Sequence, residues 1–248
     1  MIRLILIFIV IFLFMIYSIF DAVMCLILSK IGNVNVRLIR SKTIKIIFRI
    51  FIFIAGVKID VKGLENIDES EPLFVISNHR GFFDIIIGYI LLKKPCGFVA
   101  KESLKHVPFL SYWMKNIDCL FLDRNDLRSG AMMVIDAIKK IKDGVSIWLC
   151  PEGTRNKNSN PLDLLEFKAG AFKIPEKVGC KILPVAFYGT EKIFDEHKPF
   201  IKKGKVYVNI GKMYKMEDLS SDEKDNIAEY NRGIIKKLLL EIDSIVNK

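Results

Sequence analysis

The residues best suited to acid–base chemistry are a histidine and an aspartate five positions apart. His79 is one of three histidines, and it follows an apolar run, residues 73–77, that predicts a buried strand. Asp84 would open the next helix, where its carboxylate could bond one imidazole nitrogen. The other nitrogen could then deprotonate an alcohol. The spacing alone also fits a buried histidine bonded to the backbone, with Asp84 as an ordinary helix cap.

A second polar group follows another apolar run, residues 146–149. Its sequence is Pro151-Glu152-Gly153-Thr154-Arg155. A glycine lets backbone N–H groups approach an anion, a threonine hydroxyl adds a donor, and an arginine guanidinium binds two phosphate oxygens at once. The run therefore predicts a phosphate-binding loop, for which a polar surface turn is the alternative.

Two further cations stand at the ends of predicted strands. Lys101 follows residues 97–100, and Arg124 closely follows residues 120–122. One strand-end cation is usually a solvated surface charge. Together with Arg155, however, these two predict a cationic site beside His79, because the carboxyl ends of parallel strands lie at one edge of a sheet.

Short β-rich runs alternate with longer helical ones from residue 57 onward. Predicted strands cover residues 57–61, 73–77, 97–100, 120–122, 146–149, 182–188 and 206–210, and predicted helices cover residues 84–92, 127–142, 170–178 and 221–246. We expect Ser221 to cap the last helix. This alternation is typical of an α/β fold with a mixed, largely parallel sheet covered by helices. Pro184 and Val185 would be structural residues of a buried strand, or would wall an acyl-chain channel.

The first 55 residues differ from the rest in charge and hydropathy. They carry seven Lys or Arg against one acid, Asp21, and so hold +6 of the chain's formal +10. From residue 4 to 20, only Tyr17 and Ser18 are not plainly apolar. A helix of that length spans about 25 Å, slightly less than a bilayer core of about 30 Å, and extending it through Asp21 would place a charge in lipid. We therefore expect residues 1–55 to be a retained membrane anchor before a catalytic domain at 56–248.

Two interpretations of the anchor, residues 1–55, fit the sequence. Residues 35–55 mix five cations with apolar side chains, which favours two helices packed together on or partly in one leaflet. The alternative is a single span followed by a basic cytosolic flank. Both readings place the catalytic domain at the cytoplasmic face of the cell membrane.

Several classes of protein are disfavoured by missing patterns. The five cysteines lie far apart without metal-ligand spacing, so we expect no metal site. No G-x-S-x-G elbow is present to support a lipid hydrolase, and neither nucleotide-binding glycine motif occurs. We expect no nucleic-acid partner. A catalytically silent membrane protein is disfavoured because His79, Asp84, Glu152 and Arg155 are all present.

Four blocks, in order and spacing, resemble the glycerolipid acyltransferase family, and within it the bacterial 1-acylglycerol-3-phosphate acyltransferases. They are N-H-x-x-x-x-D at residues 78–84, F-L-D-R at 121–124, P-E-G-T-R at 151–155 and L-P-V at 183–185. Residues 101–109 and 167–170 are similar to two further family segments. Gly81 stands where the family often has Ser, and Asp118-Cys119 stands where a small pair containing Gly is common.

The resemblance implies residue roles and a reaction. His79 would be the general base and Asp84 its orienting partner. The residues implied to bind the glycerol phosphate are Lys101, Arg124, Glu152, Gly153, Thr154 and Arg155. The reaction would move an acyl group from acyl-CoA or acyl-carrier protein, as co-substrate, to the sn-2 hydroxyl of 1-acylglycerol-3-phosphate, giving phosphatidic acid. Another lysolipid or glycerol 3-phosphate is the alternative acceptor. No permanently bound cofactor is implied.

Overall fold

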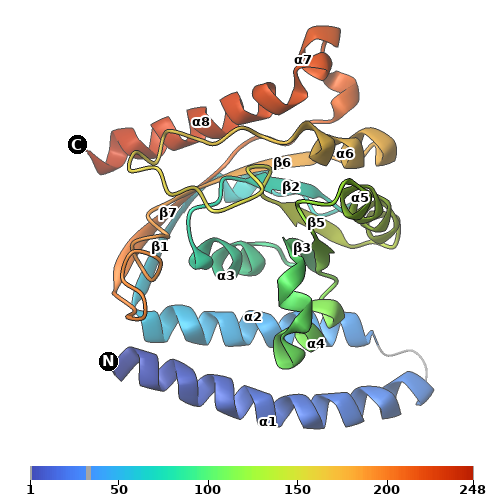
Figure 1. Cartoon of the computed structure of the whole chain (residues 1–248), viewed down its shortest axis with the longest axis vertical. Coiled ribbons are helices and arrows are strands. Elements are labelled where there is room, and N and C mark those ends of the chain that lie inside the picture. The colour runs from blue at the N-terminus through green and yellow to red at the C-terminus, as the bar shows by residue number, and fades with distance from the viewer. Residues whose placement is uncertain (1, 32–34, 248) are drawn as a thin grey trace.

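The computed structural model describes residues 2–31 and 35–247, and it places a seven-stranded sheet between helices on both faces (Figure 1). The strands are β1 (Val57–Lys62), β2 (Phe74–Ser77), β3 (Cys96–Lys101), β4 (Leu120–Leu122), β5 (Ser146–Leu149), β6 (Ile182–Tyr188) and β7 (Gly204–Ile210). The helices are α1 (Ile2–Ile31), α2 (Val36–Ala55), α3 (Phe82–Leu91), α4 (Pro108–Asn116), α5 (Leu127–Lys142), α6 (Lys173–Val178), α7 (Ser221–Asp225) and α8 (Ile227–Val246).

The sheet has the strand order β1-β7-β6-β2-β5-β3-β4. Neighbouring strands are parallel in every pair except β6 and β7, which are antiparallel. The predicted mixed, largely parallel sheet is therefore confirmed. Because β6, β2 and β5 are adjacent and parallel, the segments that leave their carboxyl ends meet at one edge of the sheet. Those segments begin at residues 189, 78 and 150.

The central strands are apolar because both of their faces are covered. All residues of β2 and β5 are buried, as expected for parallel strands between two helical layers. Phe74 packs in the core on the side of α5 and α8, and the next residue, Val75, packs in the core on the side of α2 and α3. On α3, a Cβ at Gly88 would lie 3.1 Å from the Trp148 ring, so this glycine allows close packing of helix on sheet.

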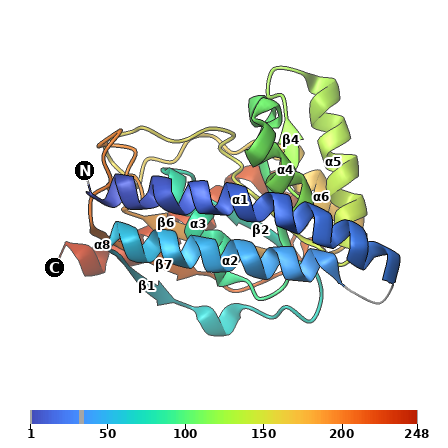
Figure 2. The same ribbon diagram turned by 90° about the horizontal axis from the view of Figure 1, so that it is seen from below.

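The N-terminal segment forms two antiparallel helices that lie side by side along one face of the domain (Figure 2). Helix α2 is part of the core, because Ile44, Ile52 and Ala55 are buried and Lys45 Nζ donates to the Lys93 carbonyl at 2.7 Å. Helix α1 packs outside α2. Within residues 2–31 and 35–247, α1 is the one helix long and apolar enough to cross a bilayer, judged by length and composition.

The charge of Asp21 is neutralised inside the protein. Asp21 Oδ2 lies 3.0 Å from Arg40 Nη2 of α2 and accepts a hydrogen bond from the Tyr112 hydroxyl of α4, also at 3.0 Å. Close by, the Trp113 indole N–H donates to Ser18 Oγ at 2.6 Å. Asp21 therefore faces the domain, which removes the difficulty of placing a carboxylate in lipid.

The cations of α2 are less available to a membrane than their sequence pattern indicates. Arg37 pairs with Asp118 at 3.1 Å, and Arg40 and Lys45 contact the protein groups described above. Lys42 and Arg49 are exposed. Only part of the predicted basic face is therefore free to meet lipid headgroups.

The C-terminal helix begins differently from the prediction. The predicted single helix over residues 221–246 is divided at Asn226 into α7 and α8. The cap is Ser220 and not Ser221, because Ser220 Oγ accepts the Glu223 N–H at 3.3 Å while the Glu223 carboxylate accepts the Ser220 N–H at 2.8 Å. This reciprocal pair is a capping box, which the sequence allows at either serine by position alone.

Candidate active site

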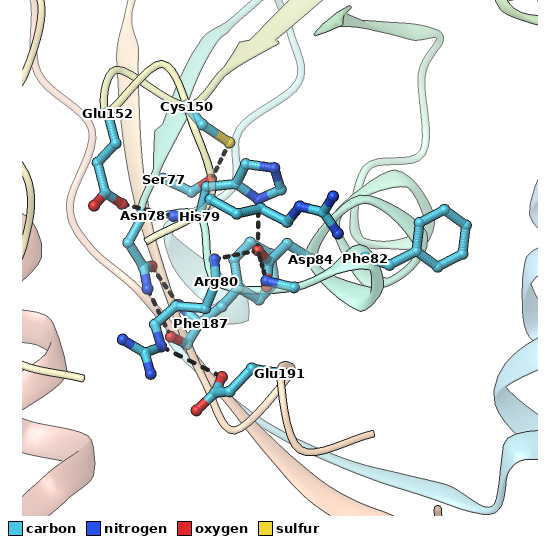
Figure 3. Close-up of polar contacts among 12 residues, drawn as sticks. Ser77, Asn78, His79, Arg80, Phe82, Asp84, Cys150, Glu152, Phe187 and Glu191 are labelled. Atoms are coloured by element: carbon cyan, nitrogen blue, oxygen red, sulfur yellow. Dashed lines mark hydrogen bonds and ion pairs between the residues drawn. The ribbon is translucent and has the colours of Figure 1, made fainter. Parts of the chain in front are cut away.

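A histidine and an aspartate meet just beyond the carboxyl end of β2 (Figure 3). His79 Nδ1 lies 2.7 Å from Asp84 Oδ2, which also accepts the backbone N–H groups of Arg80 at 2.7 Å and Gly81 at 2.9 Å. Asp84 is 1% exposed and the His79 side chain 16% exposed. Two backbone N–H groups and one imidazole nitrogen therefore converge on a single carboxylate oxygen. With Nδ1 hydrogen-bonded to Asp84, Nε2 is the ring nitrogen left free to accept a proton.

The turn between these two residues depends on glycine at position 81. Gly81 is the N-cap of α3, and Asp84 at the third helical position bonds back to its N–H. A Cβ at Gly81 would lie 2.9 Å from both the Glu191 amide nitrogen and Asp195 Oδ2. The loop after β6 approaches the turn too closely for a side chain. Gly81 therefore fits this chain better than the Ser expected from the family pattern.

Asp118 belongs to the Asp118-Cys119 pair, where a small pair containing Gly is common in the family. The backbone conformation of Asp118 explains why glycine is common there. Its φ is +64°, in the left-handed region that favours glycine. The carboxylate is held by Arg37 at 3.1 Å and Lys140 at 2.7 Å, so it joins α2 to α5. These contacts are structural, and they lie within the domain.

Asn78 holds the end of β2 against β6. Its side-chain amide donates to the Phe187 carbonyl and accepts the Phe187 N–H, each at 2.8 Å. On the other side of β2, the Trp148 indole donates to Ser77 Oγ at 2.9 Å. Asn78 belongs to the N-H-x-x-x-x-D block, but its spacing gives no indication of this role, because the partner is more than a hundred residues away.

The loop after β5 wraps around the histidine backbone. Glu152 Oε1 accepts the His79 N–H at 2.8 Å and Oε2 accepts the Leu165 N–H at 3.0 Å, while the Asn156 N–H donates to the His79 carbonyl at 2.7 Å. Burial raises the pKa of Glu152 despite these hydrogen bonds. Gly153 follows with φ +70°, which a glycine adopts freely. Both oxygens of Glu152 thus bind backbone, and a carboxylate offers no attraction to phosphate.

The predicted cations gather beside this loop. Arg155 Nη1 lies 2.5 Å from Asp195 Oδ1, and its side chain is otherwise exposed. Partial burial of the guanidinium and the charge of Arg155 lower the pKa of Arg124. Lys101 is exposed at the end of β3, next to the strand that precedes Arg124. Thr154 is also exposed. These residues follow the carboxyl ends of adjacent parallel strands, as the sequence predicted. Their contacts with phosphate stay a prediction.

Pro184 and Val185 lie inside β6. Pro184 pairs with Ile76 and Val185 with Ser77 across the parallel register, and both are buried. Their packing fits the structural alternative. An acyl-chain contact for either residue stays a prediction.

The most important residue that the sequence patterns miss is Asp195, between β6 and β7. Its Oδ2 accepts the Phe82 N–H at the start of α3 at 2.7 Å, and its Oδ1 contacts Arg155 and, at 2.7 Å, Lys198 Nζ. No periodicity or motif marks this segment. Its position follows only from the antiparallel return of β7 beside β6. Within the described residues, no group of three His, Cys, Asp or Glu side chains is placed to hold a metal ion.

Comparison with known proteins gives a family for this site. A family model described as Acyltransferase matches residues 58–188. A 1-acyl-sn-glycerol-3-phosphate acyltransferase of Borreliella burgdorferi is 34% identical over 77% of this chain and 75% of its own length. One from Saccharomyces cerevisiae is 28% identical over 91% of this chain and 73% of its own length. The chain therefore belongs to the acyltransferase family.

A solved structure shares the fold. The crystal structure of the 1-acyl-sn-glycerophosphate acyltransferase from Thermotoga maritima superposes with a TM-score of 0.80 at 24% identity, covering 98% of this chain and 95% of the other. Coverage of almost the whole chain means that the likeness includes the N-terminal helices as well as the α/β domain.

Proposed function

We propose that this acyltransferase moves a fatty acyl group from a thioester to the sn-2 hydroxyl of 1-acylglycerol-3-phosphate, giving phosphatidic acid for phospholipid synthesis. The observation that carries the proposal is the 2.7 Å contact between His79 Nδ1 and Asp84 Oδ2, beside a loop that presents Arg155. The relatives from Borreliella burgdorferi and Saccharomyces cerevisiae, both named for this reaction, support the choice of acceptor.

The chemical step uses the free nitrogen of the imidazole. His79 Nε2 takes the proton of the acceptor hydroxyl as its oxygen attacks the thioester carbonyl carbon. The resulting tetrahedral intermediate collapses with cleavage of the carbon–sulfur bond, and the departing thiolate takes the proton from the imidazolium. No acyl-enzyme is needed, because a thioester is already activated. The enzyme's tasks are then to align the hydroxyl and to deprotonate it.

Acceptor recognition rests on the cations at the carboxyl edge of the sheet. A phosphate monoester offers several oxygens to a guanidinium fork, and Arg155 has donors left beyond the one that contacts Asp195. Arg124 and Lys101 supply further positive charge from the neighbouring strand ends. Glu152 supports the base through the His79 backbone and does not itself bind phosphate.

The membrane contact is made by the outer face of α1. Large apolar side chains on this helix are exposed, among them Phe8, Phe12 and Ile19. Helix α2 lies between α1 and the sheet (Figure 1), and the exposure of these side chains shows that the domain does not cover them. A contiguous apolar surface of this kind is suited to the acyl region of a bilayer. Since α1 lies lengthwise along the domain, both helices sit in one leaflet, with the catalytic domain at the cytoplasmic face.

The acyl donor is acyl-CoA or acyl-carrier protein, used as a co-substrate. Both carry the acyl group on phosphopantetheine, and both are acidic. The chain's formal net charge of +10 favours association with either donor.

A panel of acceptors tests the proposal directly. The purified protein would be offered 1-acylglycerol-3-phosphate, other lysophospholipids and glycerol 3-phosphate, each with acyl-CoA and with acyl-carrier protein, and products would be identified by mass. We expect phosphatidic acid from 1-acylglycerol-3-phosphate at the highest kcat/KM. Faster acylation of glycerol 3-phosphate or of a lysolipid with a different headgroup would replace the proposed acceptor.

A further inference from the structure

We propose that Lys198 is a further cation for the acceptor's phosphate and that Asp195 is the positioning residue that aligns it with Arg155. This inference rests on the proposed function, because it assumes a phosphate-bearing acceptor. Both residues lie outside the matched family segment, residues 58–188, and outside the four sequence blocks.

The two cations share a single oxygen atom. Asp195 Oδ1 contacts Arg155 Nη1 at 2.5 Å and Lys198 Nζ at 2.7 Å. Both charged heads are therefore held side by side on one carboxylate. The Asp195 side chain is only 12% exposed, whereas those of Arg155 and Lys198 are 44% and 45% exposed, so the cations are the more accessible groups for a ligand.

The same carboxylate is tied to the catalytic turn. Its other oxygen, Oδ2, accepts the Phe82 N–H at 2.7 Å. The N–H of the preceding residue, Gly81, donates to Asp84 Oδ2, which in turn binds His79. The N–H groups that bind Asp84 and Asp195 therefore belong to consecutive residues, Gly81 and Phe82. The dyad and the two cations are attached to the same turn. A phosphate bound by the cations is held at a fixed distance from the dyad.

Lys198 is restrained further by aromatic packing. Its Nζ lies 5.4 Å from the centre of the Phe194 ring, which packs edge-on against Phe82 with centroids 6.3 Å apart. A lysine that contacts a ring face and a carboxylate at once loses part of its freedom before any ligand arrives. This restraint reduces the entropy cost of placing the ammonium on a phosphate.

The donors and charges of the group suit a phosphate monoester. An ammonium has three N–H donors and a guanidinium five, so each cation retains donors after binding Asp195. Arg155, Lys198 and Asp195 together carry one net positive charge. A phosphate dianion is attracted to that group more strongly than the zwitterionic headgroup of a lysophospholipid without a terminal phosphate.

A surface ion pair between Asp195 and Lys198, three residues apart, is the simpler interpretation. Exposed pairs of this kind contribute little to stability and influence no particular substrate. The two interpretations differ in what removal of the ammonium does. A surface pair predicts a small change in stability only, and a phosphate contact predicts a change in the KM for one of the two substrates.

Three lysine variants separate these interpretations. Lys198→Ala removes the ammonium, Lys198→Arg restores a cation, and Lys202→Ala removes an exposed lysine of the same segment whose ammonium has no partner among the described residues. Steady-state kinetics would be measured with 1-acylglycerol-3-phosphate and acyl-CoA. For Lys198→Ala we expect the acceptor KM to rise about tenfold, as for loss of a charge-assisted hydrogen bond, with the donor KM unchanged. Lys198→Arg should recover most of this loss, and Lys202→Ala should match wild type.

Asp195→Asn tests the positioning role. Its amide oxygen can still accept the Phe82 N–H, so the start of α3 keeps its partner, but the charge that holds both cations is gone. We expect the acceptor KM to rise and the donor KM to stay within about twofold, with little change in melting temperature. An acceptor KM in Asp195→Asn equal to that of wild type would remove this role.

The outcomes distinguish this inference from the proposed function. If wild-type protein acylates 1-acylglycerol-3-phosphate but Lys198→Ala has the same acceptor KM as Lys202→Ala, the Lys198 site is wrong and the proposed function stands. If wild-type protein acylates only an acceptor without phosphate, the proposed function and this inference both fall.

Discussion

Glu152 Oε1 accepts the backbone N–H of His79 at 2.8 Å, so the loop after β5 supports the base at the end of β2. Three residues further along the same loop, Arg155 presents a guanidinium to the surface beside the site. One loop therefore anchors the His79 backbone and also carries the Arg155 guanidinium. Under the proposed function, deprotonation and acceptor alignment are linked through this loop.

The first prediction concerns Glu152. Glu152→Gln offers one acceptor oxygen and one NH₂ donor, so one of the N–H groups of His79 and Leu165 loses its partner. An unpaired desolvated N–H costs about 1–3 kcal/mol, which lowers the melting temperature by roughly 2–12 °C in a domain of this size. We expect kcat to fall, because the His79 backbone shifts, and the acceptor KM to change little.

Glu152→Asp serves as the matched control, because it keeps the charge but is too short to reach both N–H groups. It should resemble Glu152→Gln. If instead Glu152→Gln raises the acceptor KM strongly while Glu152→Asp behaves as wild type, the carboxylate charge acts on the acceptor and the bracing role is incorrect.

The second prediction concerns Arg155. Arg155→Lys keeps the positive charge but loses the bidentate fork, so we expect a raised KM for 1-acylglycerol-3-phosphate and a lowered kcat where alignment suffers. The donor KM should change less, because the guanidinium is proposed to bind the acceptor's phosphate and not the thioester. Steady-state kinetics with a melting-temperature control would measure this. Equal effects on both substrates would show that Arg155 only stabilises the loop.

The third prediction concerns the membrane face of α1. Deletion of residues 1–55 would also remove Ile44 and Ile52 from the core, so substitutions are the better test. Replacing Phe8, Phe12 and Ile19 with Ser removes three side chains that would each contribute about 1.5–3 kcal/mol when buried in lipid. We expect vesicle binding in a sedimentation assay to weaken by a hundredfold or more.

The control for this assay lies on the opposite side of the molecule. Leu240 and Ile245 on α8 are also exposed and apolar, and α8 is far from α1 across the sheet (Figure 1). Substituting both with Ser should leave vesicle binding unchanged. Equal binding by the α1 variant and wild type would refute the assignment of α1 as the membrane face.

The strands and the dyad were predictable because their signals are local. Short apolar runs such as residues 73–76 predict strands buried on both faces, and the run is followed by polar residues at its carboxyl end. The five-residue spacing of His79 and Asp84 works because a helix starts between them, so the third residue of that helix bonds back to the turn. Both features are set within ten residues of sequence.

Features that depend on distant parts of the chain were not predictable in this way. Asp21 reads as a charge in a membrane helix until the antiparallel packing of α2 brings Arg40 to it. Asp195 lies in a segment without pattern, and only the pairing of β6 with β7 places it at Phe82. Glu152 was expected at the phosphate because the resemblance assigned the residues of the P-E-G-T-R block to phosphate binding together. In the structure, its Oε1 accepts the His79 backbone N–H.

The central claim is that His79 removes the proton from the acceptor hydroxyl, and the turnover of His79→Ala tests it most directly. The measurement is kcat with saturating 1-acylglycerol-3-phosphate and acyl donor, on protein whose melting temperature and lysolipid binding match wild type. Because general-base catalysis contributes about 10²–10⁴-fold, we expect kcat to fall by at least 10²-fold. A folded His79→Ala protein that binds lysolipid and turns over within a few-fold of wild type would contradict the mechanism.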